Sequence, residues 1–404
     1  MSDTQRPTIS TSTRPISGGV TAAHGFTAGA ATAGLKPSGT PDLALVASDR
    51  PAALAGVFTT NVVKAAPVLL CRERVASGQG QAVVINSGNA NACTGEDGLR
   101  AAERMATAAA TRLGIAPEQV LVLSTGVIGV PLPVERVEAA LPALTLAPDG
   151  GDSAARAIMT TDTRPKTAAV EIETAETTVR VGGMAKGAGM ICPTMATMLA
   201  VITTDAVVAP AALQFHLATA AARSFNRIDV DGDMSTNDTV LLLANGASAA
   251  TLSEEVFAAA LQEVCTSLAR QVAADGEGAT KLIEATVTGA ATERDAETVA
   301  RAIVGSSLTK AAMYGNDPNW GRIMCAAGYS GVRFDPAAAH LIVQDIPLFG
   351  AGMPLSFDRA SASAALRATE VHIVLDLGAG DAQATAWGCD LTPGYVHINA
   401  DYTT

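Results

Sequence analysis

The chain has 404 residues, a formal net charge of −12 at pH 7, 48% hydrophobic residues and only 3% aromatic residues. This length exceeds what a single typical core supports, so we expect two packed lobes. The negative charge repels phosphate backbones and anionic membrane surfaces, and few aromatic rings are present to stack on bases. Neither nucleic acid nor a membrane is therefore an expected partner.

The terminal residues and the cysteines bear on the compartment. The first fifteen residues are polar and contain no apolar core, which is atypical of a secretory signal. The apolar stretch at 197–210 is too short to cross a bilayer because Thr203, Thr204 and Asp205 interrupt it. The six cysteines have no CxxC spacing, as is usual for core thiols in a reducing compartment. Together these features predict a cytoplasmic protein.

Strand-like and helix-like segments alternate along the chain. The strand candidates end in clusters of Gly, Ser, Asn or Thr, and Ala-rich helical patterns lie between them. The strand candidates are 81–88, 118–129, 178–187, 340–345 and 370–376, and the helix candidates are 97–114, 209–224 and 253–274. This alternation predicts an α/β or α+β protein, with a smaller lobe after about residue 290.

The densest cluster of unusual residues is GGMAKGAGMICPTMATMLAVITTDA, at 182–206. Its glycines permit close backbone approach, and Lys186 places a cation in an apolar, Met-rich setting. The segment has neither the GxxxxGK[ST] order of a phosphate-binding loop nor a GxGxxG fingerprint. Its residues alone leave two interpretations open, a functional site and a glycine-rich packing turn.

Two patterns that could bind a metal lack the required spacing. The segment DVDGDMSTNDT, at 229–239, alternates acidic residues as calcium loops do. However, Gly232 stands at the fourth position rather than the sixth, and Val240 occupies the twelfth position, where a bidentate Glu belongs. The five histidines occur singly, without an HExxH motif or a nearby CxxC pair. We therefore expect no metal ion.

A set of motifs gives the glycine-rich segment a specific meaning. The string KGAGMICPTMATML, at 186–199, resembles the self-cleavage segment of the ornithine acetyltransferase (glutamate N-acetyltransferase) family of arginine biosynthesis, in which the chain breaks between an Ala and a Thr. The matching bond here joins Ala196 to Thr197. Other matching strings follow the family's order from about residue 15 onwards: NSGNANACTG (86–95), STGVIG (124–129), MTTDTRPK (159–166), DGEGATKLIE (275–284), YGNDPNWGRI (314–323) and HINADYTT (397–404).

The resemblance implies a fold and a chain organisation. The fold would be an α-β-β-α sandwich, as in related self-processing aminopeptidases, followed by a smaller α+β lobe. The sandwich would span about 15–290, and the lobe at about 291–404 would send its tail back to the site. Cleavage would give an α chain of residues 1–196 and a β chain of residues 197–404, and such pairs associate into an α2β2 heterotetramer.

Cleavage before Thr197 also makes chemical sense. A threonine hydroxyl is a poor nucleophile at neutral pH and needs an adjacent base. Cutting the preceding peptide bond frees an α-amino group on the same residue, with a pKa of about 7.7 to 8.0. In the uncleaved chain this nitrogen is an amide, so we expect acetyl transfer only after cleavage. A lone threonine is usually structural; the matching motif around Thr197 favours a nucleophile.

The resemblance assigns the other site residues by position. Thr125 and Gly126 match the oxyanion-hole pair, which acyl transfer needs because negative charge develops on the carbonyl oxygen. Taken alone, such a Thr-Gly pair is more often an ordinary turn. The positions that match substrate-binding residues are Thr160, Lys186, Thr197, Glu277, Asn399 and Thr404. We expect Lys186 to bind a carboxylate and Glu277 to pair with the cationic end of ornithine.

The implied reaction is a two-step ping-pong transfer. Thr197 would take acetyl from N2-acetyl-L-ornithine and pass it to L-glutamate without a metal or organic cofactor. Some members of the family also use acetyl-CoA, and no residue of this sequence decides that point. Two other interpretations stay open. A self-processed aminopeptidase or amidase would pass its acyl group to water, and a non-catalytic binding protein would keep an unbroken chain.

Overall fold

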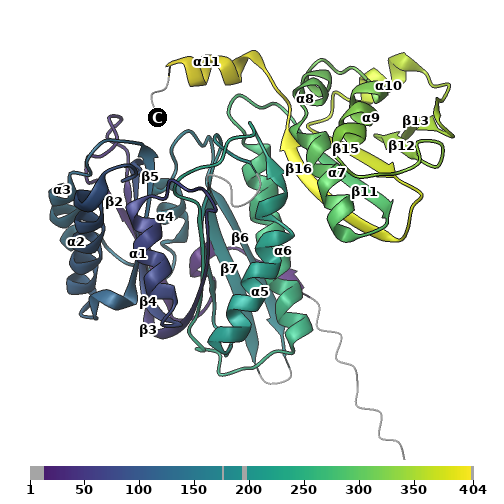
Figure 1. The fold of residues 1–404 in the computed structure, drawn as a ribbon. Helices are drawn as coiled ribbons and strands as arrows, with labels where there is room; N and C mark the ends of the chain where they lie inside the picture. The colour runs from purple at the N-terminus through teal and green to yellow at the C-terminus, as the bar shows by residue number, and fades with distance from the viewer. Residues whose placement is uncertain (1–12, 175–176, 193–197, 402–404) are drawn as a thin grey trace, which may run out of the picture.

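The computed structural model describes residues 13–174, 177–192 and 198–401, which fold into two lobes (Figure 1). Within these residues the larger lobe has a nine-stranded sheet in the order β1-β6-β7-β8-β10-β3-β4-β5, with β2 beside β3. Its strands are β1 (Thr13–Pro15), β2 (Phe26–Ala31), β3 (Leu43–Phe58), β4 (Gln79–Asn89), β5 (Val120–Val127), β6 (Lys166–Glu173), β7 (Thr178–Lys186), β8 (Leu199–Thr204) and β10 (Thr239–Ala244).

The long strand β3 divides this sheet into two stacked layers. Its first half pairs with β2 and β4, and its second half pairs with β10 and, at Ala52 and Ala53, still with β4; the exposed residues 49–51 separate the halves. One face of β3, β4 and β5 therefore packs on one face of β7, β8 and β10. Residues from both layers share one buried cluster, including Val46, Val83, Leu123, Val201 and Leu241. Alternate side chains along each strand point to the outer faces.

Helices cover both outer faces of the stacked layers, as Figure 1 shows. On one side lie α5 (Pro210–Ala222) and α6 (Glu254–Ala274), and on the other lie α2 (Gly95–Leu113) and α3 (Val134–Ala140). The helix α6 begins after Ser253, whose side chain accepts a hydrogen bond from the amide of Val256. Two further helices, α1 (Ala66–Val75) and α4 (Gly151–Ala157), complete the lobe. The predicted α-β-β-α sandwich is confirmed.

The smaller lobe contains the second sheet, in the order β14-β13-β12-β15-β11-β16-β9. Its strands are β9 (Ile228–Asp229), β11 (Leu282–Ala290), β12 (His340–Val343), β13 (Ile346–Gly350), β14 (Met353–Pro354), β15 (Glu370–Asp376) and β16 (Ala382–Cys389). Its helices are α7 (Glu293–Gly305), α8 (Ser307–Tyr314), α9 (Trp320–Tyr329) and α10 (Arg359–Ala365). The strand β9 connects the lobes, because it follows α5 in the chain and pairs with β16.

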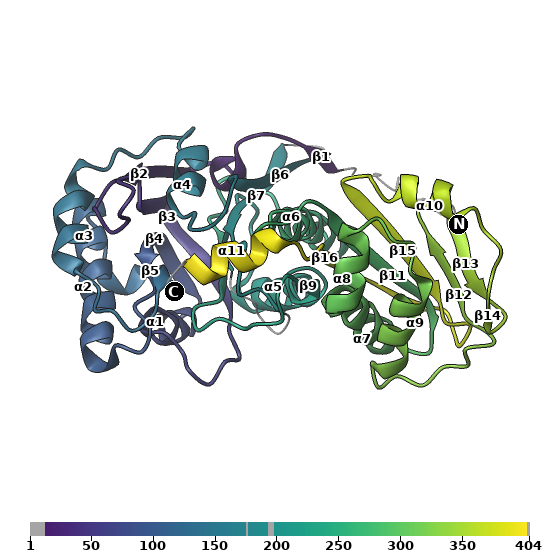
Figure 2. The same cartoon turned by 90° about the horizontal axis from the view of Figure 1, so that it is seen from above.

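The final helix, α11 (Pro393–Asp401), leaves the smaller lobe and extends back over the larger one (Figure 2). It follows β16 after a short loop, and side chains of α11 reach the loop between α6 and β11. Across the described ranges, no helix is long and apolar enough to span a membrane.

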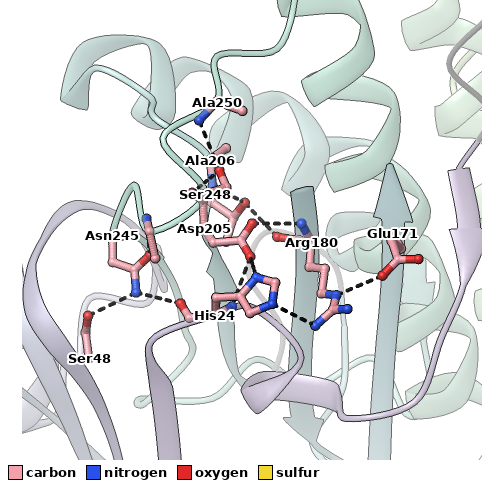
Figure 3. Close-up of polar contacts among 11 residues, drawn as sticks. His24, Ser48, Glu171, Arg180, Asp205, Ala206, Asn245, Ser248 and Ala250 are labelled. Atoms are coloured by element: carbon pink, nitrogen blue, oxygen red, sulfur yellow. Dashed lines mark hydrogen bonds and ion pairs between the residues drawn. The ribbon is translucent and has the colours of Figure 1, made fainter. Parts of the chain in front are cut away.

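A buried carboxylate, Asp205, fixes the end of β8 (Figure 3). It accepts hydrogen bonds from the backbone amides of His24, at 3.0 Å, and Arg180, at 2.8 Å, and its Oδ2 lies 2.8 Å from Nδ1 of His24. Arg180 in turn donates from Nε to Glu171 on β6 at 2.9 Å. In the β7–β8 ladder this network lies at the opposite end from Lys186. It therefore holds the two strands together and leaves the end with Lys186 to other contacts.

We expect Asp205→Ala to lower the free energy of unfolding by about 2 to 4 kcal/mol, because two backbone N–H groups would lose their acceptor. His24→Ala should cost less, since the imidazole of His24 is half exposed and its removal leaves the carboxylate with its backbone donors. Urea unfolding measures both values. Equal losses in the two variants would contradict the assignment of Asp205 as the centre of the network.

Candidate active site

One cavity brings together six of the residues singled out in the sequence: Thr125, Gly126, Thr160, Lys186, Glu277 and Asn399. They come from the end of β5, the loop after α4, the end of β7, the loop between α6 and β11, and helix α11. Segments far apart in the sequence therefore meet at one place. The other predicted positions, Ala196, Thr197 and Thr404, lie outside the residues that the structure describes.

The strand end that carries Thr125 and Gly126 requires glycine at residue 126. Gly126 has a φ of +133°, and a Cβ there would lie 2.3 Å from the carbonyl carbon of Gly88 on β4. The hydroxyl of Thr125 accepts a hydrogen bond from Nζ of Lys186 at 3.3 Å. Its own proton can therefore be donated to a further acceptor. The cavity thus has a hydroxyl donor beside an ammonium group.

Buried amides hold this strand end in place. The side chain of Asn237 donates to the carbonyl of Ala90 at 2.7 Å and to that of Ser124 at 2.8 Å. The hydroxyl of Ser124 donates to Asn86 at 2.6 Å. Asn86 and Ala90 belong to the motif NSGNANACTG, which begins within β4 and continues beyond its end. This motif therefore supports the residue immediately before Thr125 and lines the cavity only through Ala90.

Behind the cavity lies a chain of alternating buried charges, Asp162, Lys166 and Asp275. The side chain of Lys166 is 0% exposed, and its Nζ lies 2.6 Å from Oδ1 of Asp162 and 2.6 Å from Oδ2 of Asp275. The amide of Thr160 also donates to Asp162, at 2.9 Å. The ion pairs join the loop of Thr160 to the loop of Glu277, because Asp275 precedes Glu277 by two residues. Two walls of the cavity thus share one support.

Asp162 also faces Lys186. Its Oδ2 lies 3.9 Å from Nζ of Lys186, and its Oδ1 accepts the amide of Gly187 at 2.7 Å. Burial opposes ionisation of Asp162, but the ammonium groups of Lys186 and Lys166 outweigh it and hold its pKa below the usual range. Burial lowers the pKa of Lys186, and the charge of Asp162 opposes that change. The carboxylate therefore offsets part of the cost of placing a cation in the cavity wall.

Glu277 also lines the cavity, and three neighbours hold it in place. Its backbone amide donates to the carbonyl of Ala188 at 2.9 Å, and its Oε2 accepts a hydrogen bond from Asn399 at 2.7 Å. A Cβ at Gly189 would lie 2.4 Å from the carboxylate of Glu277. Only glycine therefore leaves room for this carboxylate, and α11 contributes directly to the cavity.

Sequence reasoning missed the wall formed by residues 231–237. Asp231, Asp233, Ser235, Thr236 and Asn237 line the cavity, together with Tyr395 of α11. The acidic residues of this segment resemble those of a calcium loop, but its polar run between two buried strands is the signal of a site. Among the described residues, no group of three or more His, Cys, Asp or Glu side chains could hold a metal ion.

A further buried acid, Asp238, directly precedes β10 and contacts the residue before β8. Its Oδ1 accepts the backbone amide of Met198 at 3.0 Å, and the carboxyl group is buried. Burial raises its pKa well above the usual range, against the opposing effects of the Met198 amide and the Thr59 hydroxyl. The carboxyl group of Asp238 thus contacts the peptide nitrogen of Met198, the residue that follows Thr197.

The stacked sheets and the charge-lined cavity at their strand ends define an enzyme of the α-β-β-α sandwich class. The chain matches the ArgJ family over residues 27–404. It is 55% identical over 399 residues to the arginine biosynthesis bifunctional protein ArgJ of Symbiobacterium thermophilum, with 96% of this chain and 99% of the relative covered. The chain therefore belongs to the ArgJ family.

Two solved structures are also similar. The arginine biosynthesis bifunctional protein ArgJ of Bacillus halodurans is 46% identical with a TM-score of 0.48, and the match covers 50% of this chain and 97% of that chain. The ornithine acetyltransferase of Mycobacterium tuberculosis, complexed with ornithine, is 44% identical with a TM-score of 0.43, covering 45% and 99%. The family match and the relative at 55% identity confirm the predicted family and the predicted enzyme of arginine biosynthesis.

The charge of Asp162 should be visible in the pH dependence of stability. Because its pKa lies below the unfolded value of about 3.9, its ionised form stabilises the fold above about pH 4, and this contribution is lost as the pH falls further. Asp162→Asn should lower the free energy of unfolding by about 3 to 5 kcal/mol at pH 7, since two buried ammonium groups lose a counter-charge.

The measurement is urea unfolding of Asp162→Asn and wild type at neutral and acidic pH. The difference between them should shrink as the pH falls below about 4. Asp381→Asn, an exposed change of the same charge, is the matched control and should leave stability nearly unchanged. A difference that is the same at every pH would contradict an ionised Asp162 in the fold.

Proposed function

We propose that the chain cleaves itself between Ala196 and Thr197 and then transfers acetyl from N2-acetyl-L-ornithine to L-glutamate through an acetyl-Thr197 intermediate. One observation carries the proposal: side chains chosen from distant motifs gather around a single cavity. In this proposal Thr125 and Gly126 form the oxyanion hole. The substrate-binding residues are Thr160, Lys186, Thr197, Glu277, Asn399 and Thr404.

Chain connectivity supports Thr197 as the nucleophile of this cavity. In the β7–β8 ladder Lys186 pairs with Leu199, which follows Thr197 by two residues. Consecutive Cα atoms are about 3.8 Å apart, so only a short tether joins Thr197 to the strand beside Lys186. The buried Asp238 binds the amide of Met198, the residue between Thr197 and Leu199.

The first half-reaction releases ornithine. The Thr197 hydroxyl oxygen attacks the acetyl carbonyl carbon of acetylornithine, and the freed α-amino group of Thr197 accepts the hydroxyl proton. Negative charge on the carbonyl oxygen is stabilised by the Thr125 hydroxyl and the backbone N–H of Gly126. The C–N bond of the substrate then breaks, and the Thr197 ammonium returns the proton to the departing amine. Acetyl is left as an ester on Thr197.

The second half-reaction reverses these steps with another amine. The neutral amino group of glutamate attacks the ester carbonyl carbon, and the same two donors stabilise the second oxyanion. The C–O bond breaks, the Thr197 hydroxyl recovers its proton, and N-acetylglutamate leaves. One amide replaces another, so the exchange is close to thermoneutral and needs no metal or organic cofactor. Exclusion of water keeps the ester available for glutamate.

The charges of the cavity suit the first substrate. Acetylornithine carries one carboxylate and one side-chain ammonium group, and the cavity is lined by the ammonium group of Lys186 and the carboxylate of Glu277. Charge-assisted hydrogen bonds to both ends would fix the acetyl group between them. Thr160 and Asn399 are placed by Asp162 and by Glu277, so they can complete this recognition.

Three further features of the proposed function follow from the family. The relative at 55% identity is named bifunctional, which supports a second activity with acetyl-CoA as acetyl donor to glutamate. The α and β chains would stay associated and form an α2β2 heterotetramer. The enzyme would act in the cytoplasm on small molecules, consistent with a net charge of −12, which disfavours binding to nucleic acid or a membrane surface.

Intact mass spectrometry tests this proposal directly. Wild type should give two fragments divided at Ala196 and Thr197, and incubation with acetylornithine should add one acetyl group to the β chain, which glutamate then removes. Thr197→Ala should stay uncut and unlabelled. A wild-type chain that remains whole and unlabelled would sink the mechanism, and loss of the acetyl group to water alone would favour the amidase interpretation.

Gly189→Ala tests Glu277 as a binding residue. A methyl group at 2.4 Å from the Glu277 carboxylate must displace it, so we expect the KM for acetylornithine to rise by about tenfold, the effect of losing one charge-assisted hydrogen bond. The matched control is Gly328→Ala on α9, where a Cβ meets no atom within 4 Å. Steady-state kinetics of both variants measure the effect. An unchanged KM in Gly189→Ala would argue against substrate binding by Glu277.

A further inference from the structure

The stretch from Gly187 to Cys192 is the last part of the chain that the structure describes before the proposed cut. In the whole chain both of its ends are covalently tethered, whereas after the cut it belongs to the free C-terminal end of the α chain. Its residues line the cavity at Gly189 and Met190. Non-covalent contacts must then hold this part of the cavity wall.

Several of those contacts come from residues that the cut assigns to the β chain. The carboxylate of Asp231 accepts the amide of Met190 at 2.6 Å through Oδ2 and the amide of Ile191 at 2.8 Å through Oδ1. The amide of Val230 donates to the carbonyl of Ile191 at 2.8 Å. One carboxylate therefore accepts hydrogen bonds from two successive N–H groups of the α-chain segment. The backbone of Val230, next to Asp231, also binds the segment.

The geometry of the segment shows why such a carboxylate is needed. Met190 has a φ of +57°, a conformation that a residue with a side chain rarely adopts without external support. The preceding residue, Gly189, packs against the carboxylate of Glu277. A small rotation of the segment would therefore alter the wall that faces the substrate.

The surroundings of Asp231 place it inside the site rather than on the outer surface. It lines the cavity, and burial raises its pKa to about 6. The titratable side chains that interact with it are Cys192, Asp233, Cys389 and Tyr395, and the backbone amides of Met190, Ile191 and Asp233 oppose the effect of burial. The two N–H groups of the α-chain segment are therefore prominent among the partners that stabilise its charge.

We propose that Asp231 is a positioning residue that clamps the Gly189–Ile191 segment of the α chain onto the β chain after cleavage. This inference rests on the proposed cleavage at Ala196 and Thr197. The clamp keeps Gly189 against Glu277 and preserves the hydrogen bond from the Glu277 amide to Ala188. Asp231 acts on the substrate only through these neighbours.

Hydrogen exchange measured by mass spectrometry on the full protein tests the clamp. Asp231→Asn keeps the shape of the side chain but loses one acceptor oxygen, so the amides of Met190 and Ile191 should exchange about tenfold faster or more in the cleaved enzyme. The same substitution in the uncleavable Thr197→Ala chain should have a smaller effect, because both ends of the segment remain tethered. Asp381→Asn, an exposed change of the same charge in the smaller lobe, is the matched control and should leave exchange at Met190 and Ile191 as in wild type.

Steady-state kinetics provide a second measurement, because a purely structural role would not change KM and kcat by different amounts. In cleaved Asp231→Asn, the KM for acetylornithine should rise more than kcat falls, and exchange in the smaller lobe should stay as in wild type. Exchange at Met190 and Ile191 equal to that of cleaved wild type would overturn the clamp, and so would faster exchange throughout the protein. If wild type is not cut, the fragment masses show that the proposed function has failed, independently of the exchange data.

Discussion

The placement of one ammonium group determines much of the organisation of this site. Lys186 is 3% exposed at the end of β7, where a cation without counter-charges would be costly. Asp162 compensates for it at 3.9 Å, but Asp162 is itself buried and also pairs with Lys166, which pairs with Asp275. The charges therefore alternate inward from the cavity. Each buried charge is stabilised by the opposite charge next to it. The row of charges therefore holds the loop of Asp162 and the loop of Asp275 in place.

The alternating charges explain how separate segments are brought into one wall. Asp162 binds the amide of Thr160 and the amide of Gly187, while Asp275 precedes the Glu277 wall by two residues. The two-layer sheet supplies the rigid frame, since Lys166 and Lys186 stand at the ends of the paired strands β6 and β7. A binding site built on strand ends and tied by buried ion pairs is more precisely shaped than one built on loops alone.

Local patterns predicted the frame better than they predicted the walls. Periodicity located α6 and β7 to within two residues. One face of each element packs on the core, so apolar residues recur in the sequence at helical or strand spacing. Motif resemblance selected Lys186, Glu277 and Asn399, but it could not show that α11 crosses the larger lobe to reach Glu277. Asp231 was missed because its importance depends on two backbone amides forty residues earlier in the chain, a long-range contact without a local signature.

The sheet also accounts for how two chains could remain one enzyme after a cut between β7 and β8. The β-chain strands β8 and β10 would lie between α-chain strands on both sides, with β7 next to β8 and β3 next to β10. Separation would therefore require both ladders to break and would expose the buried cores on both faces of the sheet. The cut would remove a peptide bond between two strands, β7 and β8, that backbone hydrogen bonds already hold together. The described stretch after β7, residues 187–192, lies outside these two ladders and is held by backbone bonds and by the side chain of Asp231.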